Sequence, residues 1–413
     1  MRVEVINTGT ELLLGNVVNT HLKLFAEAVF PLGLRIERQI TVPDGRAIRE
    51  ALEETFGRAE IVFVTGGLGP TTDDMTREIT ADLLGVALVH DEEIMRAITA
   101  RFARRGLKLS ARVALQALRP READVLPNSH GTAPGLYFPA NPDRRSPHLF
   151  LLPGPPRELR PMFYETVLPI LERILPPRPI MEMRTYRIAG LGESGVEELV
   201  GEALLALGLE LGYCARPGEV DLRTIGAPEI LDQAQSIITA KLGLHIVSED
   251  LRAIEQVVVD LLTARHETVA TAESCTGGFL AHRLTNVPGA SAVFVEGFVT
   301  YANDAKVRTL GIPAAALEAH GAVSAVVAQA MAEGARRAAG VDYALATTGI
   351  AGPGGGSEEK PVGTVFIALA SQLGPTLVER HRFPTDRETF KFLTTQTALN
   401  QLRQQLLGVP PSA

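Results

Sequence analysis

The sequence is poor in cysteine, lacks a long apolar run and has no excess of basic residues, and each absence excludes a class of protein. Only Cys214 and Cys275 occur among 413 residues, too few for a disulfide framework, so we expect a reducing compartment. The 48 acidic residues outnumber the 40 basic ones, and the net charge of -8 gives no general attraction to nucleic acid or anionic lipid. The longest apolar stretch, residues 362–378, is broken at 371–375 and is too short to span a bilayer, so it predicts two strands and a turn.

The first residues, MRVEVINTGTELLLG, lack the basic lead, apolar core and cleavage site of a signal peptide, so we expect a cytoplasmic protein. A composition of 46% hydrophobic and 21% charged residues is typical of globular chains. At roughly 100–200 residues per domain, the length predicts two to four domains.

Turn residues and apolar rhythm divide the chain into domains at 1–176, 177–250 and 251–413. The first alternates Val/Ile-rich runs such as 3–8 and 61–65 with helical patterns, which predicts an α/β fold with a mostly parallel sheet. The string PPRP at 176–179 marks a linker. The middle block reads as a compact α+β insert, and the α/β rhythm resumes in the last block.

One ligand loop is predicted in the first block by the string TGGLGPTTDD at 65–74, which directly follows an apolar strand. Glycines let the backbone approach a ligand closely, and open α/β sheets bind ligands at the carboxyl ends of their strands. Asp73 and Asp74 offer oxygens for a hard divalent cation that bridges a pyrophosphate. The alternative is that these carboxylates only cap the following helix.

Further loops, NTGTE at 7–11, Asp44, NSHGTAPG at 128–135 and LPGPPREL at 152–159, complete a pattern that resembles the three-layer molybdopterin-binding-like domain of the CinA family (competence/damage-inducible protein A). That resemblance implies hydrolysis of ADP-ribose to AMP and ribose 5-phosphate with a divalent metal ion, Mg, Mn or Co. The residues it implies at the nucleotide are Thr10, Glu11, Gly66, Gly67, Gly69, Thr71, Asp73 and Asp74, with Asp44 and Asp74 at the metal. Pterin binding without hydrolysis stays open, because the same loop would hold either phosphate.

The middle block contains a GxxG string, Gly192 to Gly195, of the kind with which KH domains clamp a nucleic-acid backbone. Residues 182–250 hold five basic and twelve acidic residues, and Glu193 lies inside the loop, so phosphate would be repelled. We therefore expect a glycine-rich helix start and no nucleic-acid partner. The block resembles the KH-like connecting module of CinA chains.

The strongest catalytic pattern is TAESCTGG at 271–278, where a strand ends, a polar turn follows and a helix begins. Amide N–H groups of Cys275, Thr276 or Gly277 could stabilise an oxyanion there, but Ser274 needs a base before it can attack. Lys306, after the apolar strand at 293–300, is the better candidate base. The histidines of this block read as surface or packing residues: His266, His282 and His320.

A lysine base must be neutral, yet with a reference pKa near 10.4 only about four lysines in ten thousand are unprotonated at pH 7. The role therefore requires burial, which lowers the pKa of an amine. Asn303 or Asp304 is expected to cap a helix there, with Tyr301 at its entrance. Without burial, Tyr301 and Lys306 would only mark a solvated helix start.

The last block resembles the α/β deamidase domain of CinA, in TAESCTGG, in Tyr301 and Lys306, which follow Ser274 by 27 and 32 residues, and in TTGIAGPGG at 347–355. The resemblance implies cleavage of nicotinamide mononucleotide (NMN) to nicotinate mononucleotide and ammonia without a cofactor. Ser274 would be the nucleophile, Lys306 the base and Tyr301 the orienting residue. The substrate-binding residues it implies are Glu273, Cys275, Thr276, Gly277, Gly278, Thr348, Gly349, Gly352 and Arg387.

The string FPTDR at 383–387 lacks the glycine of the family's usual Phe-x-Gly-Asp-Arg, although Arg387 is retained and could meet a phosphate.

Two alternatives stay open. Cys275 could replace Ser274 as nucleophile at the same helix start, or the chain could be a non-catalytic nucleotide- or pterin-binding scaffold in competence or DNA repair. Family analogy implies a homodimer. The expected ligands are small-molecule nucleotides, and no association with a membrane is expected.

Overall fold

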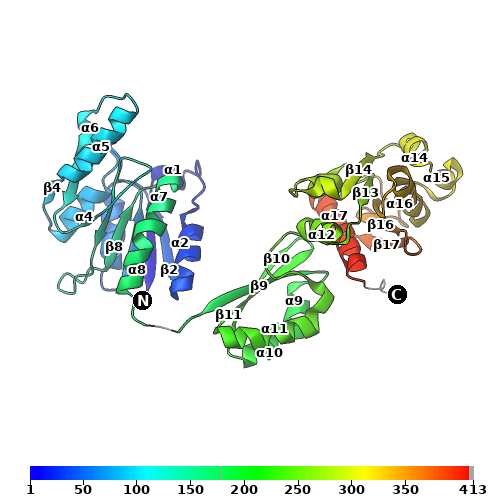
Figure 1. Cartoon of the computed structure of the whole chain (residues 1–413), viewed down its shortest axis with the longest axis horizontal. Coiled ribbons are helices and arrows are strands. Elements are labelled where there is room, and N and C mark those ends of the chain that lie inside the picture. The colour runs from blue at the N-terminus through cyan, green and yellow to red at the C-terminus, as the bar shows by residue number, and fades with distance from the viewer. Residues whose placement is uncertain (178, 409–413) are drawn as a thin grey trace. The chain divides into compact units, whose positions relative to one another are not determined.

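The computed structural model describes residues 1–177 and 179–408, which form two compact units, Met1–Met181 and Glu182–Ala413 (Figure 1). Arg178 of the expected linker and residues 409–413 of the last domain lie outside the described residues. Within the described ranges, no helix combines the length and hydrophobicity needed to cross a membrane.

The first unit is built on a six-stranded sheet in the order β2-β1-β3-β8-β7-β6. The first four strands are parallel to one another, β7 pairs antiparallel with β8, and β6 pairs antiparallel with β7. The strands predicted at 3–8 and 61–65 form as expected. The elements are β1 (Val3–Thr8), α1 (Thr10–Leu13), α2 (His21–Val29), β2 (Ile36–Val42), α3 (Arg46–Thr55), β3 (Ile61–Thr65), α4 (Thr76–Leu84), β4 (Leu88–His90), α5 (Glu92–Arg104), α6 (Ala111–Ala114), β5 (Leu118–Pro120), β6 (Asp124–Leu126), β7 (Gly135–Phe138), β8 (His148–Leu152), α7 (Pro156–Met162) and α8 (Leu168–Ile174).

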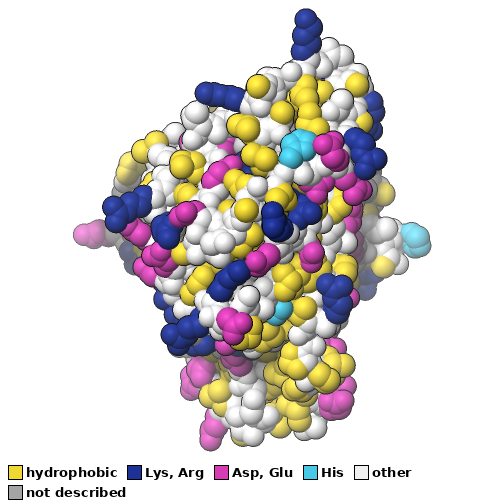
Figure 2. All heavy atoms as spheres, turned by 90° about the vertical axis from the view of Figure 1, so that its left-hand side faces the viewer, with side chains coloured by type: hydrophobic (Ala, Val, Ile, Leu, Met, Phe, Trp, Pro, Cys, Tyr) yellow, Lys and Arg dark blue, Asp and Glu magenta, His cyan; other side chains and the backbone are white. Residues whose placement is uncertain are grey.

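Helices cover both faces of this sheet, which confirms the predicted three layers. In β3, Ile61 and Phe63 point to one face and pack with α2, α7 and α8, while Val62 and Val64 point to the other and pack with α3 and α4. Because successive side chains of a strand alternate, a strand buried on both faces reads as one continuous apolar run. Figure 2 shows acidic and basic side chains interspersed over the exposed face of the first unit.

The second unit holds a four-stranded sheet, β10-β11-β9-β12, and a five-stranded sheet, β14-β13-β15-β16-β17. The stretch 362–378 forms the antiparallel pair β16 and β17 joined by a turn, as predicted. The elements are β9 (Glu182–Ala189), α9 (Glu193–Val196), α10 (Glu202–Ala206), β10 (Glu210–Arg216), β11 (Glu219–Gly226), α11 (Pro228–Leu242), β12 (Ile246–Ser248), α12 (Ile254–Arg265), β13 (Val269–Glu273), α13 (Phe279–Thr285), β14 (Phe294–Val299), α14 (Asn303–Leu310), α15 (Ala314–His320), α16 (Ala325–Ala339), β15 (Tyr343–Gly349), β16 (Thr364–Ser371), β17 (Leu377–Arg382) and α17 (Arg387–Leu406).

The four-stranded sheet packs beside the last helix through buried polar contacts. Arg403 of α17 is buried and donates to the carbonyl of Ile246 at 2.8 Å and to that of Leu244. Gln396 donates to Glu219 at 2.6 Å. Gly192 is the residue before α9, so the GxxG string is a helix start, as expected. The KH-like character of the middle domain stays a prediction.

The five-stranded sheet is also covered on both faces. Alanines of β13, β15 and β16 form the side that faces α16, and larger residues such as Val269, Leu345 and Ile367 face α12 and α17. Small side chains let a helix approach a sheet closely, so α16 lies directly on the alanine side. The parallel strands β14, β13 and β15 end at one edge of the sheet, and the strongest catalytic pattern lies there.

Candidate functional site

A cavity of about 540 Å³ opens in the first unit, where β1, β3 and β8 end. This is the position at which open α/β sheets bind ligands. Seven residues predicted from the sequence line this cleft together: Glu11, Asp44, Gly66, Gly67, Gly69, Asp73 and Asp74.

The two aspartates of the TGGLGPTTDD string do not cap a helix, so that alternative is wrong. Helix α4 begins later, at Thr76, and its N-cap, Met75, makes no side-chain capping bond. Asp74 Oδ2 instead accepts the amide N–H of Thr71 at 2.8 Å and also its hydroxyl. Thr71, predicted at the nucleotide, therefore fixes the orientation of a carboxylate in the cleft.

Asp44 is held in the same way by Thr10. Its Oδ2 accepts the amide N–H of Thr10 at 3.1 Å and the hydroxyl at 3.2 Å. Thr10 was also predicted at the nucleotide, and here too the threonine orients a carboxylate. Both aspartates thus bond through Oδ2, and both line the cleft.

The donor set of the cleft suits a hard cation that a phosphate helps to bind. Within the described ranges, no group of three or more His, Cys, Asp or Glu residues converges as a metal cage. Mg²⁺ is usually held by one or two carboxylates together with substrate phosphates and water, rather than by the protein alone. Asp44 and Asp74 fit that pattern.

The glycines of the loop are required by close packing as well as by the turn. A Cβ on Gly67, whose φ is +66°, would lie 2.1 Å from the hydroxyl of Thr76, and one on Gly69 would lie 2.4 Å from Asp74 Oδ2. Larger residues would therefore displace the loop and the carboxylate. This packing explains the glycines without a ligand, and it also shapes the cleft.

A buried histidine in this cleft was missed by the sequence reasoning. His21 lines the cavity, and its Nδ1 lies 3.0 Å from the hydroxyl of Thr65, which donates to Asn7 at 3.0 Å. Burial lowers the pKa of His21, so a neutral ring is favoured. His21 lies at the start of α2, far along the chain from the glycine loop, so no local sequence pattern linked it to this cleft.

In the second unit the predicted nucleophile and base lie in contact. Strand β13 ends at Glu273, and Ser274 follows with its amide bonded to the carbonyl of Thr347 at 2.9 Å. Lys306 Nζ lies 3.1 Å from Ser274 Oγ. Within the described part of the chain, none of the block's three candidate histidines hydrogen-bonds to Ser274; His282, for example, pairs with Asn286.

The surroundings of Lys306 favour a neutral amine. The side chain is 1% exposed, and burial lowers its pKa. Nζ contacts the carbonyls of Thr300 at 2.8 Å and Tyr301 at 3.2 Å, besides Ser274. In a neutral amine those two carbonyls take the two N–H groups, and the lone pair is left to accept the proton of Ser274.

Tyr301 does not orient the pair through its phenol, which corrects the predicted role. The side chain is 60% exposed, and its hydroxyl accepts a hydrogen bond from Arg387 Nη2 at 2.9 Å. Tyr301 hydrogen-bonds to Lys306 through its backbone carbonyl. Arg387 also donates to the carbonyl of Gly352 at 3.0 Å, so Tyr301, Arg387 and Gly352 form a separate cluster.

The side chains of Glu273 and of two neighbours of Ser274 turn inward and make structural contacts, so any contact of these neighbours with substrate is through the backbone. Glu273 is fully buried and accepts the amide N–H groups of Gly278, Leu280 and Ala281 at 2.8–3.0 Å, which satisfies the start of α13. Thr276 is buried with its hydroxyl 2.7 Å from that of Thr347.

Cys275 is also buried, and burial raises the pKa of its thiol to about 12, which disfavours a thiolate nucleophile. Further along, Thr348 is buried and its hydroxyl donates to the carbonyl of Ala322 at 2.8 Å. Thr348 and Gly349 belong to β15 rather than to the loop that follows it. The side chains of Cys275 and Thr348 are thus corrected from substrate contacts to structural ones, and the role of Gly349 stays a prediction.

Backbone amides next to Ser274 remain available for an oxyanion. The N–H of Gly277 bonds to the carbonyl of Ser274 at 3.2 Å, and that of Gly278 bonds to Glu273, so neither is free. Within residues 1–177 and 179–408, no backbone carbonyl accepts the N–H of Cys275 or Thr276. Of the three predicted oxyanion donors, the amides of Cys275 and Thr276 therefore remain, and that of Gly277 does not.

Arg387 lines a cavity of about 450 Å³ together with Phe279, Glu388 and Lys391. Lys391 lies one helical turn after Arg387, and a Cβ on Gly277 would lie 4.0 Å from its Nζ, so this cavity adjoins the turn that follows Ser274. Phe279 and Lys391 were missed by the sequence reasoning. The i,i+4 spacing of Arg387 and Lys391 was the available signal.

Comparison with known proteins agrees with both halves of this description. A family model described as "CinA C-terminal domain" matches residues 251–406, and one described as "Probable molybdopterin binding domain" matches residues 4–173. A CinA-like protein of Akkermansia muciniphila is 47% identical over 400 residues, covering 97% of this chain and 96% of that one. A Moorella thermoacetica protein named as competence-damage inducible is 44% identical over 414 residues, covering 98% and 99%.

Among solved structures, the competence/damage inducible protein CihA from Agrobacterium tumefaciens is 44% identical and covers 36% of this chain and 91% of its own, with a TM-score of 0.36. The CinA superfamily protein from Escherichia coli is 37% identical, covering 37% and 88%, also with a TM-score of 0.36. The full-length relatives span nearly the whole sequence. The chain therefore belongs to the CinA family, with a molybdopterin-binding-like domain followed by a CinA C-terminal domain.

Proposed function

We propose that the chain is a bifunctional nucleotide hydrolase whose last domain deamidates NMN. The contact between a buried Lys306 and Ser274 carries the proposal, because a desolvated amine can accept a proton that a surface lysine would not. Ser274 Oγ attacks the carboxamide carbon while its proton passes to Lys306 Nζ. The amides of Cys275 and Thr276 stabilise the oxyanion.

Lys306 then returns the proton to the departing nitrogen, which leaves as ammonia, and the substrate remains as an ester on Ser274. Water attacks this ester, its proton passing through Lys306 back to Ser274, and nicotinate mononucleotide is released. Arg387 and Lys391 supply cations for the phosphate of the mononucleotide beside this turn. No cofactor is needed for this cycle.

The first domain is proposed to hydrolyse ADP-ribose to AMP and ribose 5-phosphate. Asp44 and Asp74 would hold a divalent ion, Mg, Mn or Co, which neutralises charge on the phosphoryl oxygens. Thr10 and Thr71 keep these carboxylates oriented. The support is the convergence of the predicted residues on one cleft at the ends of parallel strands.

The test is to incubate the purified chain with NMN and with ADP-ribose, with and without EDTA, and to measure ammonia and AMP. Ser274→Ala should abolish ammonia release alone, and Asp74→Asn should abolish AMP release alone. Ser291→Ala and Asp143→Asn, both exposed and outside these sites, are the matched controls. Turnover of neither substrate would favour the alternative, a nucleotide- or pterin-binding scaffold.

A further inference from the structure

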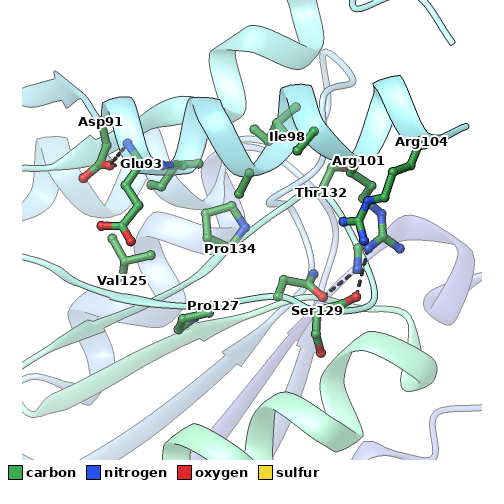
Figure 3. Close-up of a pocket in the computed structure, with 15 residues that line it drawn as sticks. Asp91, Glu93, Ile98, Arg101, Arg104, Val125, Pro127, Ser129, Thr132 and Pro134 are labelled. Atoms are coloured by element: carbon green, nitrogen blue, oxygen red, sulfur yellow. Dashed lines mark hydrogen bonds between the residues drawn. The ribbon is translucent and has the colours of Figure 1, made fainter. Parts of the chain in front are cut away.

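A second cavity, of about 460 Å³, lies in the first unit between α5 and residues 125–134 (Figure 3). We call it the α5 groove. Its volume is within the range of about 300–1,000 Å³ that is typical of small-molecule sites. Neither the proposed hydrolysis nor the amidase chemistry uses it.

The α5 groove has an apolar middle and oppositely charged ends. Ile94, Ile98 and Pro134 are among the apolar residues that line it. Figure 3 shows Glu93 beside Val125 at one end, and Arg101 and Arg104 near Ser129 at the other. Arg101 and Glu93 are eight residues apart on one helix, so about 12 Å separates the two ends.

Two of these charged groups are free to bind a ligand. Arg104 is exposed, and neither its guanidinium nor the carboxylate of Glu93 has a hydrogen-bond or ion-pair partner among the described residues. Asp91, by contrast, is fully engaged: it caps α5 and pairs with Arg119 at 2.7 Å. The available groups are therefore an acceptor at one end and a cation at the other.

The opposite wall is preformed. Arg101 donates to the carbonyls of Ser129, at 2.9 Å, and His130, and Asn128 donates to Ala133 at 2.7 Å. Thr132 lines both the α5 groove and the cleft of the first unit, so the loop is a thin wall between them. A ligand in the groove would lie next to the carboxylate-lined cleft without entering it.

We propose that the α5 groove binds a nucleoside monophosphate whose base carries an exocyclic amine, of the adenosine type. The amine donates to Glu93, the flat base packs on Ile94, Ile98 and Pro134, and the phosphate meets Arg104 and the remaining N–H groups of Arg101. The charge pattern excludes a ligand that is anionic at both ends. The site is independent of whether the neighbouring cleft hydrolyses ADP-ribose.

The experiment is calorimetric titration of the full chain with AMP in EDTA, together with photolabelling by 8-azidoadenosine 5′-monophosphate. Arg104→Gln and Glu93→Gln should each raise the Kd about tenfold, because each removes a hydrogen bond to a charged group. Arg105→Gln and Glu92→Gln, neighbours that do not line the groove, should leave the Kd unchanged. Inosine monophosphate, with a carbonyl in place of the amine, should bind about tenfold more weakly.

The label should map to α5 or to residues 125–134. Labelling of residues 66–74 or 11–21 would place AMP in the neighbouring cleft and overturn the proposal, as would the absence of AMP binding at millimolar concentration. Equal affinity for AMP and inosine monophosphate would overturn the role of Glu93. Because these readouts are binding and labelling, a failure of ADP-ribose hydrolysis leaves them interpretable.

Discussion

Replacing Lys306 by methionine is the most direct test of the amidase mechanism. Methionine has a similar length and apolar character, so it fills the same buried volume without the amine. The change removes the contacts of Nζ with Ser274 at 3.1 Å and with the carbonyls of Thr300 and Tyr301. Among the described residues, the serine then keeps no side chain within hydrogen-bond reach that can take its proton.

The expected loss of activity follows from the role assigned to the amine. General-base catalysis by a positioned side chain contributes about 10²–10⁴-fold, so Lys306→Met should lower kcat for ammonia release from NMN by at least about 100-fold. KM should change little, because Lys306 is buried and contacts Ser274 rather than the phosphate end. Lys241→Met is the matched control, because Lys241 also donates to a carbonyl, that of Leu199 at 2.8 Å, but lies in the middle domain.

The pH profile gives a second readout with a definite sign. Burial lowers the pKa of Lys306, so the active neutral form appears below the ordinary lysine range near 10.4. The kcat/KM of the wild type should rise with pH and level off above the lowered pKa. The unfolded chain binds this proton more tightly, so the free energy of unfolding should fall as pH drops from about 10.4 toward that pKa. Lys306→Met should lose both dependences.

Lys306→Arg decides between a base and a fixed cation. Arginine keeps the charge and the N–H donors but is not deprotonated in proteins. If the amine is the base, the arginine variant should be as inactive as the methionine variant. An arginine variant that keeps more than a tenth of wild-type kcat, with a melting temperature close to that of the wild type, would refute the reasoning.

Two further predictions concern the turn around Ser274. Cys275→Ser should keep ammonia release within about threefold of the wild type, because burial raises the pKa of the thiol to about 12 and a thiol that remains protonated is not the nucleophile; loss of activity in this variant together with activity in Ser274→Ala would reverse the assignment. Glu273→Ala should lower the free energy of unfolding in urea by roughly 2 kcal/mol or more, because one buried and two part-buried amides lose their acceptor, at about 1–3 kcal/mol for each buried group. Glu267→Ala, which breaks the half-exposed pair with Arg265, should cost about 1 kcal/mol or less, and an equal loss in both variants would contradict the capping role.

Secondary structure was predicted best from the sequence where a strand is buried on both faces of its sheet. Apolar runs such as 3–8 and 61–65 match β1 and β3, because a central parallel strand needs apolar residues on both faces. Helix starts were harder to predict. Asn303 or Asp304 was expected to cap α14, but the N-cap is Ala302 without a side-chain bond. Polar residues near a helix start are common, and only the backbone geometry shows which of them caps it.

For the site residues, positions in the sheet could be predicted from the sequence, but side-chain directions could not. Ser274 and Lys306 could be paired from the sequence because each follows one of two strands that run parallel in one sheet, and the ends of such strands meet at one edge. The direction of a side chain could not be predicted. Tyr301 turns to Arg387, 86 residues away, and Glu273 turns back into α13. The α5 groove depends on residues from α5 and from the loop at 125–134, a contact that no local pattern reveals.

The two candidate sites use one local design with opposite electrostatics. Each places a glycine-containing turn after a buried strand, but the acids go to different places. In the first unit, Asp73 and Asp74 line the cleft, where oxygen ligands suit a cation. In the second, the Glu273 carboxylate accepts three backbone N–H groups at the start of α13. No carboxylate contacts Lys306 among the described residues. A carboxylate beside Lys306 would favour the ammonium and raise its pKa, so burying the acid in the helix start favours the neutral amine that the proposed base requires.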